Sequence, residues 1–262
     1  NLIQNLMKNL INAIVLIASL LVMSSCNSSD DGVNNEDTTS AITLKFDQIF
    51  NGSDLISGLS YTNQANESLV FDRINYIISN IEFIKDNGDV VRVPKSESYF
   101  IVQEQNEQTY NITIRNIPTG SFSKIRFGVG VDEAQFLLGA DGQGNFLAYA
   151  QSLDMLWSWA AGYKFLAIEG NYTTNTTTQK SFKVHTGKTG LAYNYTEVEL
   201  QFPELAIVRE NFSPSIHIMT DVYSFFNGIR LSDQDQIMGG EKVSTVSNNI
   251  PSAFSVHHVH NF

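Results

Sequence analysis

Residues 69–93, LVFDRINYIISNIEFIKDNGDVVRV, contain the clearest β-hairpin of the sequence. The run from Leu69 to Ile84 is rich in β-branched and aromatic residues, which favour strands. The turn that follows at residues 86–89, DNGD, suits a hairpin because Asn and Gly tolerate a positive φ, and an apolar strand returns at residues 90–93. This stretch therefore predicts antiparallel β-structure.

Short apolar segments separated by polar turns recur along the chain from Ala41 onward. Further strand candidates are residues 42–49, 110–117, 124–131, 163–169, 181–185, 197–202, 215–222 and 253–259. Helical periodicity is scarce, and short helices are expected only at residues 134–138, 148–156 and 203–209. Roughly ten strands at this spacing predict an all-β fold, a single-domain β-sandwich or flattened barrel with a few short helices.

The composition limits the classes of partner. The 262 residues are 42% hydrophobic and 16% charged, which is enough apolar material for a sizeable core. The net charge is -11, and no basic stripe is present that could neutralise phosphates. Nucleic acid is therefore excluded as an expected partner.

The segment from Met7 to Cys26, MKNLINAIVLIASLLVMSSC, has the pattern of a secretory signal peptide. An apolar run follows the lysine, and two serines precede Cys26, the single cysteine of the chain. A cysteine in this position resembles the lipobox of bacterial lipoproteins, in which the signal is cut before the cysteine and the thiol is lipidated. We expect translation to start at Met7, residues 1–25 to be a lipoprotein signal peptide and Cys26 to carry the lipid. A transmembrane anchor is the alternative, although the run is short for a span.

Residues 26–40 are polar and acidic without apolar periodicity, so we expect a flexible tether. Residues 29–31, SDD, resemble the acidic export signals of surface-exposed lipoproteins in Bacteroidetes-type bacteria. The expected location is the bacterial outer membrane, reached through the lipid anchor. The domain of residues 41–262 is expected to face the periplasm or to be exposed at the cell surface.

Histidines near the end of the sequence suggest a metal site. His258 and His260 are two residues apart in an expected strand, so their side chains point to the same face. His217 likewise shares a face with Met219 and Asp221. Imidazole is a ligand of copper and zinc, and a thioether suits copper(I). The alternatives are a solvated tail and, for a single histidine, an ordinary residue with a satisfied hydrogen bond.

Patterns of catalytic chemistry are missing from the sequence. Gly-X-Ser-X-Gly and phosphate-binding loops do not occur, and the loop at residues 141–145, DGQGN, lacks the ligand positions of an EF-hand. We therefore expect that the protein is not an enzyme. The two tryptophans, Trp157 and Trp159, are expected either to pack as an aromatic wall or to border a ligand site.

Five segments carry a resemblance to a known family, namely residues 74–83, 125–132, 155–170, 182–187 and 249–261. The most specific of them are the Trp157-X-Trp159-X-X-Gly-Tyr-Lys-Phe segment and the later His185-X-Gly. Together the five segments resemble the MbnP-like proteins, which are secreted or lipid-anchored proteins linked to copper. The resemblance covers nearly all of residues 41–262.

The resemblance implies a β-rich extracytoplasmic domain in which histidines hold copper. It extends to His185 in the His-X-Gly match and to His258 and His260 in the tail. Some proteins of this kind carry an oxidised tryptophan in or near the site, made by a dihaem peroxidase-like partner, and Trp157 and Trp159 match the paired tryptophans.

The function expected from these patterns is that of an envelope-anchored lipoprotein that binds a metal ion, most simply copper, for uptake or handling. The expected ligands are His185, His258 and His260, with His217 as a further candidate, and Trp157 and Trp159 bordering the site. A dihaem peroxidase-like protein or a TonB-type receptor is the expected partner. The alternative function is that of a non-catalytic surface module that binds a glycan, a peptide or a partner protein.

Overall fold

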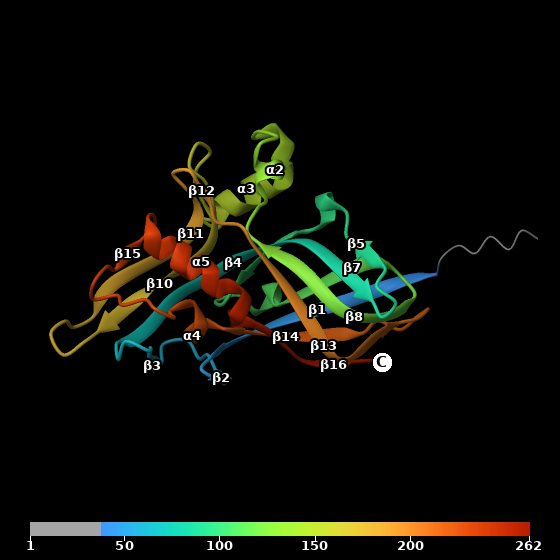
Figure 1. Ribbon diagram of the computed structural model, residues 1–262, viewed down its shortest axis with the longest axis horizontal. Helices are drawn as coiled ribbons and strands as arrows, with labels where there is room; N and C mark the ends of the chain where they lie inside the picture. The colour runs from blue at the N-terminus through green and yellow to red at the C-terminus, as the bar shows by residue number, and fades with distance from the viewer. Residues whose placement is uncertain (1–37) are drawn as a thin grey trace, which may run out of the picture. The chain divides into compact units, whose positions relative to one another are not determined.

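The computed structural model describes residues 38–262 (Figure 1). The expected signal peptide, the expected lipidation site Cys26 and nearly all of the expected tether lie outside the described residues. Within the described part of the chain, no helix is both long enough and apolar enough to cross a membrane. Two β-sheets and a few short helices make up this part, which confirms the predicted all-β class.

The smaller sheet has five strands, and its order begins with β16, β14 and β1. Its strands are β1 (Thr39–Phe50), β2 (Ser53–Asp54), β7 (Asn111–Pro118), β14 (Ser215–Asp221) and β16 (Phe254–His260). Strand β1 pairs in parallel with β14, and β14 pairs antiparallel with β16. Every second side chain of β1 from Ile42 onward is buried, so the sheet has one apolar and one polar face.

The larger sheet has eleven strands and is built around β4 (Ser68–Lys85), the first strand of the predicted hairpin. Its main path is β12 (Ala192–Tyr193), β11 (Lys180–Thr189), β10 (Gly162–Thr173), β4, β8 (Gly120–Val129) and β13 (Thr196–Val208). Short strands pair beside it, namely β3 (Ser60–Thr62), β5 (Val90–Arg92), β6 (Tyr99–Gln103), β9 (Leu156–Ser158) and β15 (Gln236–Ile237). The β4–β5 pairing confirms the hairpin.

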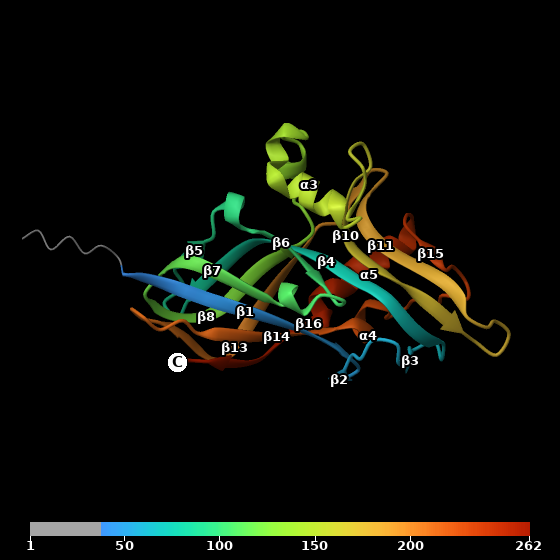
Figure 2. The same ribbon diagram turned by 180° about the vertical axis from the view of Figure 1, so that it is seen from behind.

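The main core lies between the two sheets. Phe46 of β1 is fully buried, and its ring meets those of Tyr76 and Phe127 edge to face, at 6.2 and 6.1 Å between centroids. Strand β13 at one margin of the larger sheet packs beside β16 of the smaller one, so the sheets meet along this side (Figure 2).

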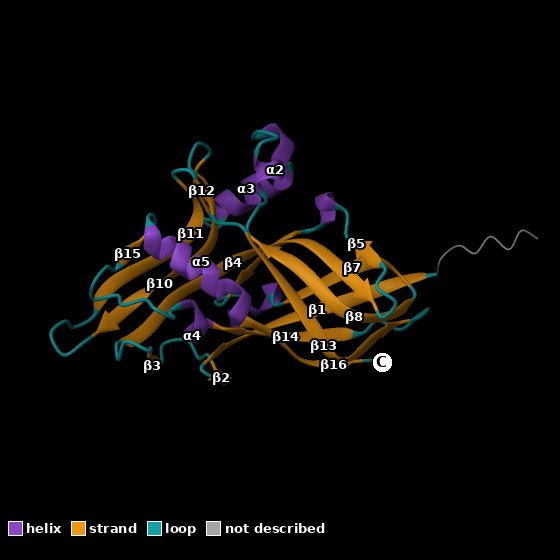
Figure 3. Cartoon of the chain, viewed as in Figure 1, coloured by secondary structure: helices purple, strands orange, loops and turns teal. Residues whose placement is uncertain are grey.

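The helices are short and lie around the sheets (Figure 3). They are α2 (Glu133–Phe136), α3 (Asn145–Ser152), α4 (Val222–Phe225) and α5 (Glu241–Ala253). The first two overlap the helices expected near residues 134–138 and 148–156. Side chains of α2 and α3 pack against a second, smaller core, which includes Met155, Tyr163 and Phe165.

One predicted helix is wrong, and one helix of the structure was not predicted. Residues 203–209 were expected to be helical, but they belong mostly to β13, where Ala206 pairs with Phe122 and Val208 with Gly120. The register shift between Gln201 and Ala206 places Pro203 in an irregular part of the strand, where proline is tolerated. Helix α5 was not expected because Ser, Asn and an internal proline weaken its helical pattern, and burial of an apolar face stabilises it instead.

Candidate metal centres

Four of the five histidines gather on the outer face of the smaller sheet. His217 lies on β14, directly opposite His258 on β16, and His260 follows two residues later on the same strand. The two flanking residues of His217, Ile216 and Ile218, are fully buried, so alternation turns its imidazole outward. We call His217, His257, His258 and His260 the edge cluster.

A β-bulge adds His257 to this cluster. His217 pairs with His258, but the next residue of β14, Ile218, pairs with Val256, so His257 is an extra residue in β16. Without the bulge, regular alternation from Phe254 and Val256 would turn His258 inward. The bulge resets the alternation: Val259 becomes the next buried residue, while His257 and His258 both stay accessible.

The imidazoles of the edge cluster are in contact. One ligand nitrogen from each of His217, His257 and His258 can be chosen so that all three lie within 4.8 Å of one another. The Nδ1 atoms of His257 and His258 are 2.6 Å apart. The ring of His258 is 4.4 Å, between centroids, from the ring of His217 and also 4.4 Å from that of His260.

Strand β1 supplies charged neighbours. Nε2 of His217 lies 3.0 Å from a carboxylate oxygen of Asp47, and Asp47 is paired at 3.4 Å with Lys45. Partial burial lowers the pKa of His217, and Lys45 and the neighbouring histidines act in the same direction, against the attraction of Asp47. Desolvation and the neighbouring histidines also lower the pKa of His258. These two imidazoles are therefore neutral near pH 7, which is the form that binds metals.

His185 does not join the edge cluster. It lies on β11 of the larger sheet, and Figures 1 and 2 show β11 and β16 toward opposite sides of the described domain. Its side chain is buried, and Nε2 lies 2.9 Å from Oε1 of Glu169 on the neighbouring strand β10. Because a carboxylate can only accept, Nε2 carries the hydrogen and Nδ1 keeps its lone pair. That buried Nδ1 has no hydrogen-bond partner among the described residues.

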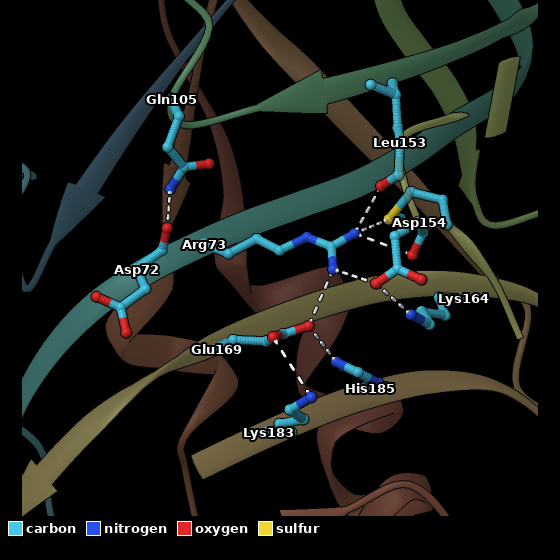
Figure 4. A network of polar contacts seen from close by, with 10 residues as sticks. Asp72, Arg73, Gln105, Leu153, Asp154, Lys164, Glu169, Lys183 and His185 are labelled. Carbon is cyan, nitrogen blue, oxygen red and sulfur yellow. Dashed lines mark hydrogen bonds and ion pairs between the residues drawn. The ribbon is translucent and has the colours of Figure 1, made fainter. Parts of the chain in front are cut away.

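A network of charged groups holds Glu169 in place (Figure 4). Arg73 of β4 lies between two carboxylates, 2.9 Å from Glu169 and 2.9 Å from Asp154. The buried Lys164 approaches the same oxygen of Asp154 to 2.8 Å. Glu169 is therefore surrounded by cations and by the ring of His185 on one face of the sheet.

The protonation states of this pair follow from burial and charge. Burial lowers the pKa of His185 to about 4, against the opposing effect of Glu169. Burial acts to raise the pKa of Glu169, but the hydrogen bond from His185 and the charges of Arg73 and Lys183 outweigh it and lower the pKa. At neutral pH the pair is thus a neutral imidazole that donates to a carboxylate.

The two tryptophans have different neighbours in the structure. The ring of Trp157 lies 6.2 Å, between centroids, from that of His185, and Trp157 also lines an open surface hollow with Met238 and Lys188. Trp159 instead packs on Phe136, with 4.9 Å between ring centroids.

The His185-X-Gly motif has a steric reason next to Trp157. A Cβ atom on Gly187 would lie 2.8 Å from Cζ3 of Trp157 and 2.4 Å from the carbonyl oxygen of Tyr163. Only a glycine therefore lets the indole lie against β11 beside His185.

Sequence reasoning found part of these sites. The spacing of His258 and His260 and the outward alternation of His217 led to residues that the structure brings together. It missed His257, because the bulge is visible only as a break in the apolar spacing at Phe254, Val256 and Val259. The partners Glu169, Arg73 and Asp47 were missed as well, because they come from strands that are distant in sequence.

These features define an all-β sandwich with two separate candidate metal sites, the buried His185 and the edge cluster. A family model for MbnP matches residues 39–243, so the chain belongs to the MbnP family. A solved structure of MbnP from Methylosinus trichosporium is similar to this chain, with a TM-score of 0.47 and 11% sequence identity over 78% of this chain and 82% of that chain. No curated protein matches the sequence.

Proposed function

We propose that this protein is an extracytoplasmic copper-binding member of its family, which takes up or handles the metal at the bacterial cell envelope. In this proposal a lipid on Cys26 tethers it to the outer membrane. Membership of the MbnP family supports copper as the metal, because the MbnP-like proteins that the sequence resembles are linked to copper. A dihaem peroxidase-like protein or a TonB-type receptor is the partner that this role predicts.

The observation that carries the proposal is the unpartnered Nδ1 of His185. A buried polar atom without a hydrogen bond is costly, so such an atom in a folded protein needs a reason. Here Nε2 is fixed by Glu169, and metal-binding histidines are commonly oriented in this way, with one nitrogen on a carboxylate and the other on the ion. The residues present therefore fit a copper ion at Nδ1.

The surroundings of His185 suit a soft ion. Trp157 would border the metal and shield it from water, because its ring lies against His185. Met238 offers a thioether, the donor that suits copper(I): it follows Ile237, which pairs with Val184 next to His185. Trp157 and Met238 line the same surface hollow, beside the end of β11.

The test is an anaerobic Cu(I) titration of the untagged chain against a competing chromogenic chelator. His185→Gln keeps a donor for Glu169 but removes the imidazole lone pair, so we expect it to bind one copper equivalent fewer than the wild type. Lys183→Gln is the matched control. Lys183 lies on β11, like His185, and its side chain also pairs with Glu169, but it is not an expected copper ligand. Equal copper binding by the wild type and His185→Gln would refute the assignment of copper to His185.

The alternative function makes the opposite prediction. A module that binds a glycan, a peptide or a partner protein would bind its ligand equally well in buffer that contains a metal chelator, and its wild-type form would take up no stoichiometric copper.

A further inference from the structure

We propose that the edge cluster is a second metal site, open to solvent, for a divalent first-row transition-metal ion, Cu²⁺ or Zn²⁺. It lies on the smaller sheet, and it goes beyond the function proposed for His185 without depending on it. His217, His257 and His258 supply the converging ligands, and His260 stands beside them as a fourth.

The nitrogens are already close to the separations that a metal site requires. Two nitrogens bound to one tetrahedral ion at about 2.0–2.1 Å lie about 3.3 Å apart. The 2.6 Å between the Nδ1 atoms of His257 and His258 is slightly shorter than this, and the other pairs among the three ligand nitrogens fall within 4.8 Å. The backbone thus already brings the three imidazoles together, and rotation of their side chains is the adjustment that a bound ion would require.

Asp47 orients one of the ligands. Its carboxylate accepts from Nε2 of His217 at 3.0 Å, so the hydrogen of this imidazole is on Nε2 and the lone pair is on Nδ1. A carboxylate that holds the far nitrogen of a histidine is a common companion of a bound metal ion. Lys45, two residues earlier on β1, pairs with the same carboxylate oxygen.

The backbone under the cluster is fixed as well. His217 and His258 face each other across paired strands, so neither is part of a free tail. After His260, the side chain of Asn261 accepts from the backbone nitrogen of Ile207 at 2.7 Å and donates to the carbonyl oxygen of Leu205 at 2.9 Å. These two hydrogen bonds anchor the end of β16 to β13, which limits the entropy lost when an ion binds.

The ligand chemistry indicates the class of ion. An all-imidazole set suits copper, zinc and nickel, whereas calcium and magnesium require oxygen ligands. At a site of this kind Cu²⁺ binds more tightly than Zn²⁺. Because His257 and His260 are exposed, the site can exchange its ion directly with solvent, unlike the buried nitrogen of His185.

Calorimetric titration of the untagged chain with Zn²⁺ and with Cu²⁺ tests the inference, with electron paramagnetic resonance of bound Cu²⁺ to detect nitrogen ligands. We expect one equivalent at the edge cluster and more than a 100-fold loss of affinity in His258→Ala, whose ring contacts those of the other three. Asp47→Asn should weaken binding by about 10–100-fold, as outer-shell partners do. Ser255→Ala is the control, because Ser255 is an exposed residue of β16 outside the cluster.

Running the same titrations in the His185→Gln background separates the two proposals. Divalent-ion binding that persists in His185→Gln and is lost in His258→Ala supports a distinct edge site. Absence of binding to the wild type, or equal binding by the wild type and His258→Ala while circular dichroism shows both to be folded, overturns it. Failure of the copper assignment at His185 leaves this result unaffected.

Discussion

Burial decides the protonation state of His185, against the opposing effect of its hydrogen bond to Glu169. The folded protein keeps the imidazole neutral down to about pH 4, whereas a histidine in the unfolded chain titrates near pH 6.5. The contribution of His185 to stability is therefore complete above pH 6.5. It is lost as the pH falls from 6.5 toward 4, because only the unfolded state then takes up a proton.

This difference predicts a pH dependence of unfolding. From the two pKa values, protonation of the unfolded His185 costs on the order of 3 kcal/mol of stability between pH 6.5 and pH 4. His185→Gln should show a correspondingly shallower fall of the free energy of unfolding over this window. Urea unfolding in the presence of a chelator, at half-unit steps of pH, measures the effect. Parallel curves for the two proteins would contradict it.

Comparison of the wild type with His185→Gln isolates this histidine from its neighbours. The lowered pKa values of His217 and His258 act in the same direction, but both proteins retain these residues. The lowered pKa of Glu169 also makes stability fall with pH, but this loss begins only near pH 4.5, the usual pKa of its side chain, where the unfolded state starts to take up a proton.

At the scale of the element, the bulge in β16 decides which histidines are accessible. Inward positions are occupied by Phe254, Val256 and Val259, a spacing of two residues and then three. If His257 is removed, this spacing becomes strictly alternating, and His258 and His260 still point outward.

Deletion of His257 is therefore expected to leave the fold intact. The free energy of unfolding should change by less than about 1 kcal/mol, a shift of roughly 4 °C or less in the thermal midpoint. Divalent-ion affinity should fall, because one of the converging ligands is lost. Differential scanning calorimetry checks the first expectation. Deletion of Val256 is the contrasting variant, because it would place the imidazole of His257 at an inward position; an equal loss of stability in both deletions would contradict the account.

Local patterns explain which elements the sequence could predict. The β4–β5 hairpin follows from strand composition and an Asn-Gly turn, and the outward position of His217 follows from alternation. Pairing between distant strands carries no local signal, so the parallel contact of β1 with β14 could not be predicted, nor could Asp47 beside His217. The same limit applies to His185 and Glu169, which meet only through the register of β10 and β11.

At the scale of the molecule, His185 and the edge cluster are on different sheets and have no partner residue in common. Sites that share no partners usually contribute additively to the free energy. The variant His185→Gln/His258→Ala should therefore lose the sum of the metal equivalents lost by the two single variants. Metal content by mass spectrometry, after loading with excess copper and desalting, measures this. A double variant that matches one single variant would indicate one shared site.

The pairing of β1 with β14 has a consequence for the way the protein is made. Thr43 faces Ser215 in the register of these strands, so this edge of β1 cannot be completed until nearly the whole chain is present. Contacts this distant in sequence form slowly. Until β14 is available, the edge of β1 that it covers has unpaired backbone groups that other chains could join, although β7 pairs with β1 along its opposite edge. This edge is therefore exposed to mispairing with other chains until the sheet is complete.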